Sequence, residues 1–192
     1  MTDLLSFAGL EPPRAATDKL MLQLKPSAQT SERLADLAAK VRRAHGLSGE
    51  LIPPDRQHIT LHYLGNYPGL PPERVAAASA AAASVKAAPF DIVLDRAGSF
   101  GAEGNRPLVL QVGEGLEPLT ALWRSLNLTL AQNQFRKFLK STYAPHLTLL
   151  YDRRDVPEHP IDPIRWTINE ITLVHGLWGE GRHVVLGRWR LG

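Results

Sequence analysis

The sequence has no cysteine among its 192 residues. Cysteine supplies disulfides, the thiolate ligands of many metal sites and the nucleophile of one class of hydrolases. All three are therefore excluded, and any catalysis must come from other side chains.

Long apolar runs are missing as well. No segment approaches the roughly 20 apolar residues that a membrane-spanning helix needs, and the N-terminus lacks the basic segment and apolar core of a signal peptide. A hydrophobic content of 44% and a net charge of only +3 are typical of a globular protein. We therefore expect a cytoplasmic protein with no membrane-spanning segment.

Hydrophobic periodicity divides the chain into a leader and one folded domain. Residues 1–18 carry a Pro12-Pro13 pair and no periodicity, which predicts a flexible leader before a single domain over 19–192. Helices are predicted at 30–46, with Thr30 or Ser31 as the N-cap and a glutamate in the first turn, at 71–88 and at 117–135. Strands are predicted at 19–25, 58–64, 90–96, 107–113, 146–152, 164–178 and 182–191. This interleaving favours an α+β fold with mostly antiparallel pairing and two similar lobes.

The same short pattern, a histidine and a threonine separated by one residue, opens two of these strands. It occurs as His58-Ile-Thr60 and as His146-Leu-Thr148. Because side chains two apart on a strand share a face, each strand presents an imidazole and a hydroxyl together. One copy alone is usually structural, since threonine is common in strands. Two copies in equivalent places suggest an internal duplication that brings the four side chains to one cleft.

This set of side chains suits phosphoryl chemistry. Hydrolysis of a phosphodiester needs a base to activate the nucleophile and an acid to protonate the leaving oxygen. Histidine has an ordinary pKa near 6.5, so one neutral imidazole and one protonated imidazole can share these tasks. Threonine hydroxyls can donate hydrogen bonds to the non-bridging phosphate oxygens. No metal or cofactor is required.

The two motifs resemble the paired signatures of the two-histidine (2H) phosphoesterase superfamily. The first continues into Tyr63, Leu64 and Gly65, and the second follows Tyr143-x-Pro145, as in the RNA 2',3'-cyclic phosphodiesterases of bacteria and archaea, historically called 2'-5' RNA ligases. The resemblance covers about residues 19–191, and its specificity rests mainly on the two motifs.

The resemblance implies a fold, a reaction and roles for the four residues. The fold would be a bilobal, pseudo-duplicated α+β structure, in which two antiparallel sheets flank a central active-site groove and helices lie outside. His58 and His146 would be the acid–base pair, while Thr60 and Thr148 hold the phosphate. By analogy His146 would activate water and His58 would protonate the departing 3'-oxygen, leaving a 2'-phosphate. The reverse assignment stays open.

The sequence departs from the family after the second motif. Members often carry an arginine where Tyr151 stands, and an arginine-proline pair where Ser141-Thr142 stands. Without these arginines, contacts to a long RNA backbone would be weaker. Tyr151 is then either a core residue or a surface on which a base stacks.

Other candidates for substrate contact come from the loops. Phe100, in a glycine-rich hairpin loop, would line the cleft or cap the core; Arg106 follows that loop, and Trp178 lies at the closing turn. His62 continues the face of His58 on an ideal strand, so it would lie at the cleft edge or be a satisfied histidine. It is too distant from His58, at roughly 13 Å, to share a metal ion.

The leading hypothesis is a metal-independent phosphodiesterase that hydrolyses a 2',3'-cyclic phosphate on RNA ends. Two alternatives remain: a phosphodiesterase acting on small 2'-5' linked or cyclic nucleotides, and a non-catalytic module that binds RNA or nucleotides. A matched acid and base argue against binding alone. ATP-dependent ligation has no supporting motif, although weak reversal of hydrolysis is chemically allowed. Nothing requires more than a monomer or an obligate protein partner.

Overall fold

A computed structural model describes residues 18–101, 104–177 and 181–192. The strands are β1 (Asp18–Leu24), β2 (Ile59–Tyr67), β3 (Phe90–Ser99), β4 (Arg106–Val112), β5 (His146–Asp152), β6 (His159–Ile168), β7 (Glu170–Leu177) and β8 (Arg182–Arg190). The helices are α1 (Ala28–Ala44), α2 (Pro72–Ala83) and α3 (Leu116–Gln132), with two short 3₁₀ turns, η1 (Pro54–Arg56) and η2 (Arg136–Phe138). The predicted α+β class and antiparallel pairing are confirmed.

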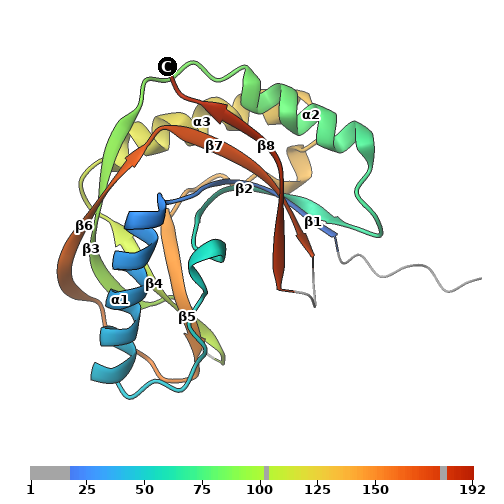
Figure 1. Cartoon of the computed structure of the whole chain (residues 1–192). Helices are drawn as coiled ribbons and strands as arrows, with labels where there is room; N and C mark the ends of the chain where they lie inside the picture. Colours follow the sequence, from blue (N-terminus) through green and yellow to red (C-terminus); the bar gives the residue numbers. More distant parts are fainter. Residues whose placement is uncertain (1–17, 102–103, 178–180) are drawn as a thin grey trace, which may run out of the picture.

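The strands form one curved sheet of eight strands, in the order β6-β3-β4-β5-β2-β1-β7-β8 (Figure 1). The expectation of two separate sheets is therefore wrong. The two central strands, β2 and β5, pair through one residue pair, Ile59 with Leu147. Their main chains approach closely enough to join two four-stranded halves into one sheet and then diverge.

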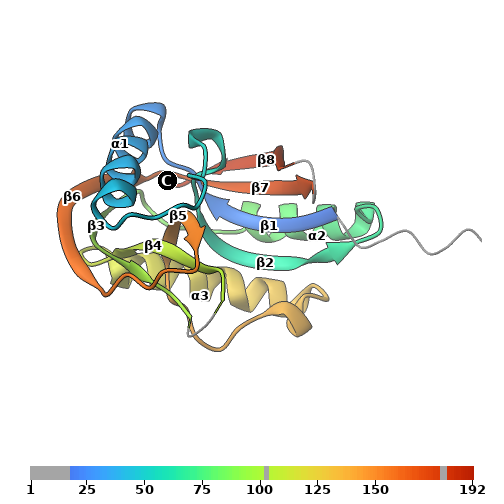
Figure 2. The same ribbon diagram turned by 90° about the horizontal axis from the view of Figure 1, so that it is seen from below.

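Helices cover the sheet on both sides. Helix α1 packs on β5 and β6, α2 packs on β7 and β8, and α3 contacts β2 and β3. Figure 2 shows α1 and α3 on opposite sides of the sheet. Helix α3 lies against β3, and the middle residues of β3 and β4 are buried. Within the described ranges, no helix combines the length and apolar character needed to cross a membrane.

The predicted helices differ from the structure at their ends, by one to five residues. Helix α1 is capped by Ser27, whose hydroxyl accepts a hydrogen bond from the amide of Thr30, and its first turn holds no acidic residue. Helix α2 ends at Ala83, although the predicted helix runs to residue 88. Pro89 disfavours helical backbone in the residue before it, and Ser84 caps the end by donating to the carbonyl of Ala81.

The predicted strand over 164–178 is two strands. Strand β6 begins earlier, at His159, and the chain turns at Asn169 into β7. The prolines of β6 are tolerated because β6 is an edge strand of the sheet. Strand β1 also begins one residue before the predicted domain start, at Asp18, which is buried and accepts from the amide of Gly69. The rest of the predicted leader lies outside the described residues.

Candidate active site

The junction between the two halves of the sheet brings the two motifs together. Ile59 and Leu147 pair across β2 and β5, and both are fully buried. The residues on either side of them point to the opposite face. That face therefore collects four half-buried side chains from two strands: His58, Thr60, His146 and Thr148.

A bulge in β2 shifts the pairing of His62 relative to that of Thr60. Thr60 pairs with Gln23 of β1, but His62 pairs with the next residue, Leu22, so the register shifts between them. His62 consequently faces α3, where it stacks on Trp123 at 5.7 Å and its Nε2 donates to the Trp123 carbonyl at 3.2 Å. Burial lowers its pKa to about 4. Both expected placements are observed, because His62 is hydrogen-bonded and also lines, with Thr60 and His146, a cavity of about 320 Å³.

The two motif histidines are held in the same way. The Nδ1 of His58 bonds to the carbonyl of Arg56, and the Nδ1 of His146 bonds to the carbonyl of Ala144, each at 2.7 Å. A carbonyl only accepts, so Nδ1 carries the proton in each case. In the neutral form the other nitrogen, Nε2, is therefore the basic one, and in the protonated form it is an acid.

The surroundings of His58 are cationic. His183 of β8 lies edge-on to the His58 ring, with ring centroids 5.4 Å apart. Burial is the main cause that lowers the pKa of His58, and the charges of Lys25, His146 and Arg56 lower it further, against the bond from the Arg56 carbonyl. The pKa of His183 falls to about 4, again mainly through burial. His58 is therefore neutral at neutral pH.

The surroundings of His146 are aromatic. Phe100 lies edge-on to His146 at 5.0 Å. Nearby, Tyr143 stacks on Trp123 at 5.1 Å and its hydroxyl donates to the carbonyl of Thr60 at 3.3 Å. These residues line a cavity of about 320 Å³ where β2 and β5 diverge. Of the two placements expected for Phe100, the structure has the one in which it lines a cavity, beside His146.

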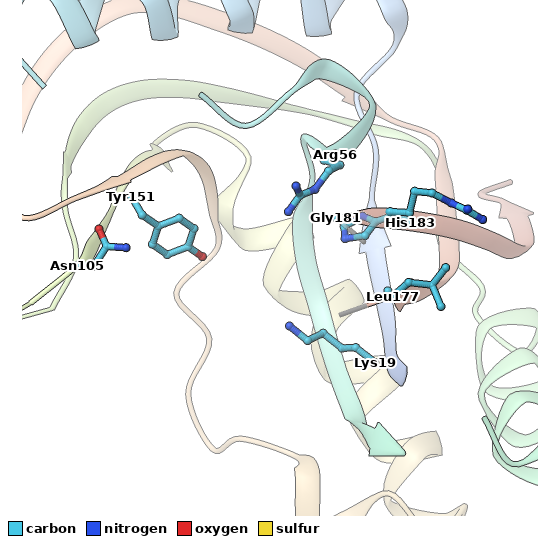
Figure 3. Close-up of a pocket in the computed structure, with 9 residues that line it drawn as sticks. Lys19, Arg56, Asn105, Tyr151, Leu177, Gly181 and His183 are labelled. Carbon is cyan, nitrogen blue, oxygen red and sulfur yellow. The ribbon is translucent and has the colours of Figure 1, made fainter. Parts of the chain in front are cut away.

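A larger cavity, of about 710 Å³, opens on the His58 side. Its lining residues are Lys19, Arg56, Asn105, Tyr151, Gly176, Leu177, Gly181, Arg182 and His183. Figure 3 shows Tyr151 and Asn105 on one wall, with Arg56 and His183 on the other. Tyr151 is 47% exposed. Of its two predicted roles, the structure therefore excludes packing in the core.

Of the remaining two predicted contacts, the structure describes only Arg106, which it does not bring to the site. The guanidinium of Arg106 donates to Asp155 at 2.9 Å, and Arg106 lines neither cavity. A carboxylate three residues beyond β5 thus holds it away from the cleft. Trp178 lies outside the described residues.

Sequence reasoning missed Arg56, His183 and Gln23. Arg56 precedes His58 by two residues, a spacing that would have indicated a shared face had the strand been extended backwards. His183 lies on the last strand, where no local signal marks it. Gln23 is fully buried beside Thr60 in the pairing of β1 with β2, and neither atom of its amide has a hydrogen-bond partner in the described structure.

The glycine that extends the first motif has a packing reason. Gly65 has a φ of +117°, and a Cβ on it would lie 2.6 Å from the ring of Phe138. Any side chain would therefore strain the backbone and displace that ring, which packs edge-on against Tyr63. The aromatic-Leu-Gly continuation is thus explained by close packing on η2.

The described residues contain no group of three or more histidine and carboxylate side chains arranged to hold a metal ion. The four motif residues, with two imidazoles and two hydroxyls at one junction, can instead transfer protons and hold an oxyanion.

Comparison with known proteins places the chain in a family. Residues 26–177 match the sequence profile of the 2'-5' RNA ligase superfamily. No curated protein matches the chain. Among solved structures, apo E. coli LigT has a TM-score of 0.74 at 24% identity, covering 91% of this chain and 97% of LigT. LigT complexed with 3'-AMP has 0.73 at 25% identity, covering 91% and 98%. The protein TT0787 of Thermus thermophilus has 0.72 at 22% identity, covering 90% and 97%. Because the profile matches most of its length, this chain belongs to the 2'-5' RNA ligase superfamily.

Proposed function

We propose that this protein is a metal-independent phosphodiesterase that hydrolyses a 2',3'-cyclic phosphate at the end of an RNA or on a nucleotide. One observation carries the proposal: two histidines, each with Nδ1 bonded to a main-chain carbonyl at 2.7 Å, flank one strand junction together with two threonines. LigT, a protein of similar fold, has been crystallised with 3'-AMP, which supports a nucleotide substrate.

The reaction needs one proton accepted and one proton donated. A water oxygen attacks phosphorus and gives its proton to a neutral imidazole, while the bond from phosphorus to the 3'-oxygen breaks. The second imidazole, protonated, gives its proton to that oxygen, so a 2'-phosphate remains. The hydroxyls of Thr60 and Thr148 donate to the non-bridging oxygens as charge builds on them.

The electrostatics favour His58 as the base. Burial and the nearby charges of Lys25 and Arg56 lower its pKa, which keeps its Nε2 unprotonated and able to accept a proton. We therefore assign the base to His58 and the acid to His146, the reverse of the roles that the family resemblance favours. A bound phosphate partly offsets the cations but leaves the burial of His58 unchanged.

The test is hydrolysis of a short RNA that ends in a 2',3'-cyclic phosphate, measured in the presence of EDTA. His58→Ala and His146→Ala should each lower kcat by about 10²–10⁴-fold. His159→Ala is the matched control, because His159 makes the same bond to the carbonyl two residues before it but lies on edge strand β6. Chromatography of the product identifies the phosphate position.

Three outcomes would count against the proposal. Activity that EDTA abolishes would overturn the metal-independent mechanism. Full activity in either histidine variant would overturn the paired-histidine assignment. No cleavage of this RNA would exclude it as substrate and favour 2'-5' linked dinucleotides, which the tyrosine at position 151, in place of a backbone-binding arginine, also favours.

A further inference from the structure

The cavity of about 710 Å³ is next to the motif residues rather than centred on them. Arg56 and His183 line its wall, and both also adjoin His58: one through its main-chain carbonyl and the other through its ring. Tyr151 faces them across the cavity (Figure 3). A nucleotide whose phosphate reaches His58 would therefore extend into this cavity. Its volume lies within the range of about 300–1,000 Å³ usual for small-molecule sites.

The wall of this cavity is positively charged. Among the described lining residues are the cations Lys19, Arg56 and Arg182, and none is a carboxylate. The positive potential acts on His183, because its pKa of about 4 reflects, after burial, the charges of His58, Arg56, Lys25 and Lys19. Such a wall is complementary to an anion.

Arg56 has hydrogen-bonding capacity to spare. Its Nε is buried, and no described residue accepts a hydrogen bond from it. Its main-chain carbonyl, not its side chain, holds the imidazole of His58. Arg56 lines the cavity, where its planar guanidinium can bind a phosphate in a fork geometry.

We propose that this cavity binds a second phosphate group of the substrate, in addition to the phosphate that is hydrolysed. The inference rests on the proposed function and narrows its substrate class. The motif hydroxyls and imidazoles occupy the oxygens of the cleaved phosphate, so Arg56 serves another anion. Arg56 contacts that anion, and the exposed ring of Tyr151 packs against the ribose or base that links the two phosphates.

The second phosphate has two possible sources with the same chemistry. It is either a 5'-phosphate monoester on the terminal nucleotide or the diester that joins the terminal nucleotide to the one before it. Three substrates separate these cases: adenosine 2',3'-cyclic phosphate, its 5'-phosphorylated form, and a dinucleotide ending in the same cyclic phosphate. Only the first lacks a second phosphate.

The experiment compares kcat/KM for the three substrates in wild type, Arg56→Gln and Arg124→Gln. Wild type should prefer at least one two-phosphate substrate by tenfold or more, mainly through KM, and the preferred one identifies the source. Arg56→Gln should reduce that preference at least fivefold, because any effect on His58 is common to all substrates and cancels in the ratio. Arg124→Gln removes the same charge from an exposed position on α3 and should leave the ratio unchanged.

Two outcomes would overturn the second-phosphate site. One is a wild-type ratio near one between kcat/KM for the two-phosphate substrates and kcat/KM for adenosine 2',3'-cyclic phosphate. The other is a ratio that Arg56→Gln does not change. Binding separates this failure from failure of the proposed reaction. Calorimetry with adenosine 3',5'-bisphosphate and adenosine 3'-monophosphate requires no turnover. Tighter binding of the bisphosphate, lost in Arg56→Gln, would support the site even if no cyclic phosphate were cleaved. Equal binding of both would overturn it.

Discussion

The two halves of the sheet carry the same motif in different surroundings. Directly before β2, His58 lies among cations and is edge-on to His183. In β5, His146 lies against the ring of Phe100. The neighbours of the threonines differ too, because Thr60 pairs with Gln23 of β1 whereas Thr148 pairs with Val109 of β4.

In the proposed mechanism, this difference lets two similar strands serve an asymmetric reaction. The motif fixes what each strand contributes: one imidazole with a defined tautomer and one hydroxyl. The neighbouring strands and turns decide which imidazole is neutral, because burial and nearby charges act on pKa over several ångströms. Changing one half toward the other therefore tests which features of the asymmetry matter.

The largest effect should come from removing the hydroxyls that the halves share. Thr60→Val and Thr148→Val keep β-branched side chains on the strands but remove one donor each to the phosphate. Each should lower kcat by about 10²-fold or more with little change in unfolding, as for loss of an oxyanion donor. Steady-state kinetics with thermal unfolding checks this. A much smaller loss at one threonine would show that only one half holds the phosphate.

The second comparison is between His62 and its counterpart in β5, the fully buried Leu150. The folded pKa of His62 is about 4, below the ordinary 6.5, so the unfolded chain binds a proton more readily. Its contribution to stability is complete above pH 6.5 and is lost as the pH falls toward 4, by up to about 3 kcal/mol. His62→Leu should therefore make stability less dependent on pH across this window.

Urea unfolding at pH 7 and pH 4.5 measures that effect. Wild type should lose more stability than His62→Leu between the two values. His183, whose pKa is also about 4, is unchanged in this variant, so part of the acid sensitivity should persist. Equal acid sensitivity in both proteins would show that His62 does not titrate in this range.

Strands β2 and β5 also show which features could be predicted from the sequence and which could not. The period-two pattern of 146–152 gives β5 its exact bounds, and the motif residues share a face because strand geometry requires it. The bulge that precedes His62, which stacks on Trp123, has no signal in the pattern. The joining of β2 to β5 by one pair, and the approach of His183 to His58, depend on tertiary pairing between distant segments. A single sequence does not specify such pairing.

A substitution at Gln23 tests the difference between the neighbours of the two threonines, which are Gln23 for Thr60 and Val109 for Thr148. Its amide is buried with no described partner for either atom, an arrangement that costs about 1–3 kcal/mol of stability. Gln23→Leu makes this position apolar, as Val109 is in the other half. We expect the free energy of unfolding to rise by about 1 kcal/mol while kcat falls, because the amide lies beside Thr60. Reduced stability would show that the amide has structural partners. An unchanged kcat would show that it has no role in turnover.

The smallest expected effect concerns the cations around His58. In the free protein the acidic limb of the kcat/KM profile reports the pKa of the base. Because Lys25 is one cause of the lowered pKa of His58, Lys25→Met should raise that pKa and move the acidic limb to higher pH. The shift should be modest, since burial, the largest cause, is unchanged. Lys40→Met, on the surface of α1, removes the same charge at a distance and should leave the limb in place. If Lys25→Met leaves the acidic limb where it is in wild type, the base is not His58, and the assignment passes to His146.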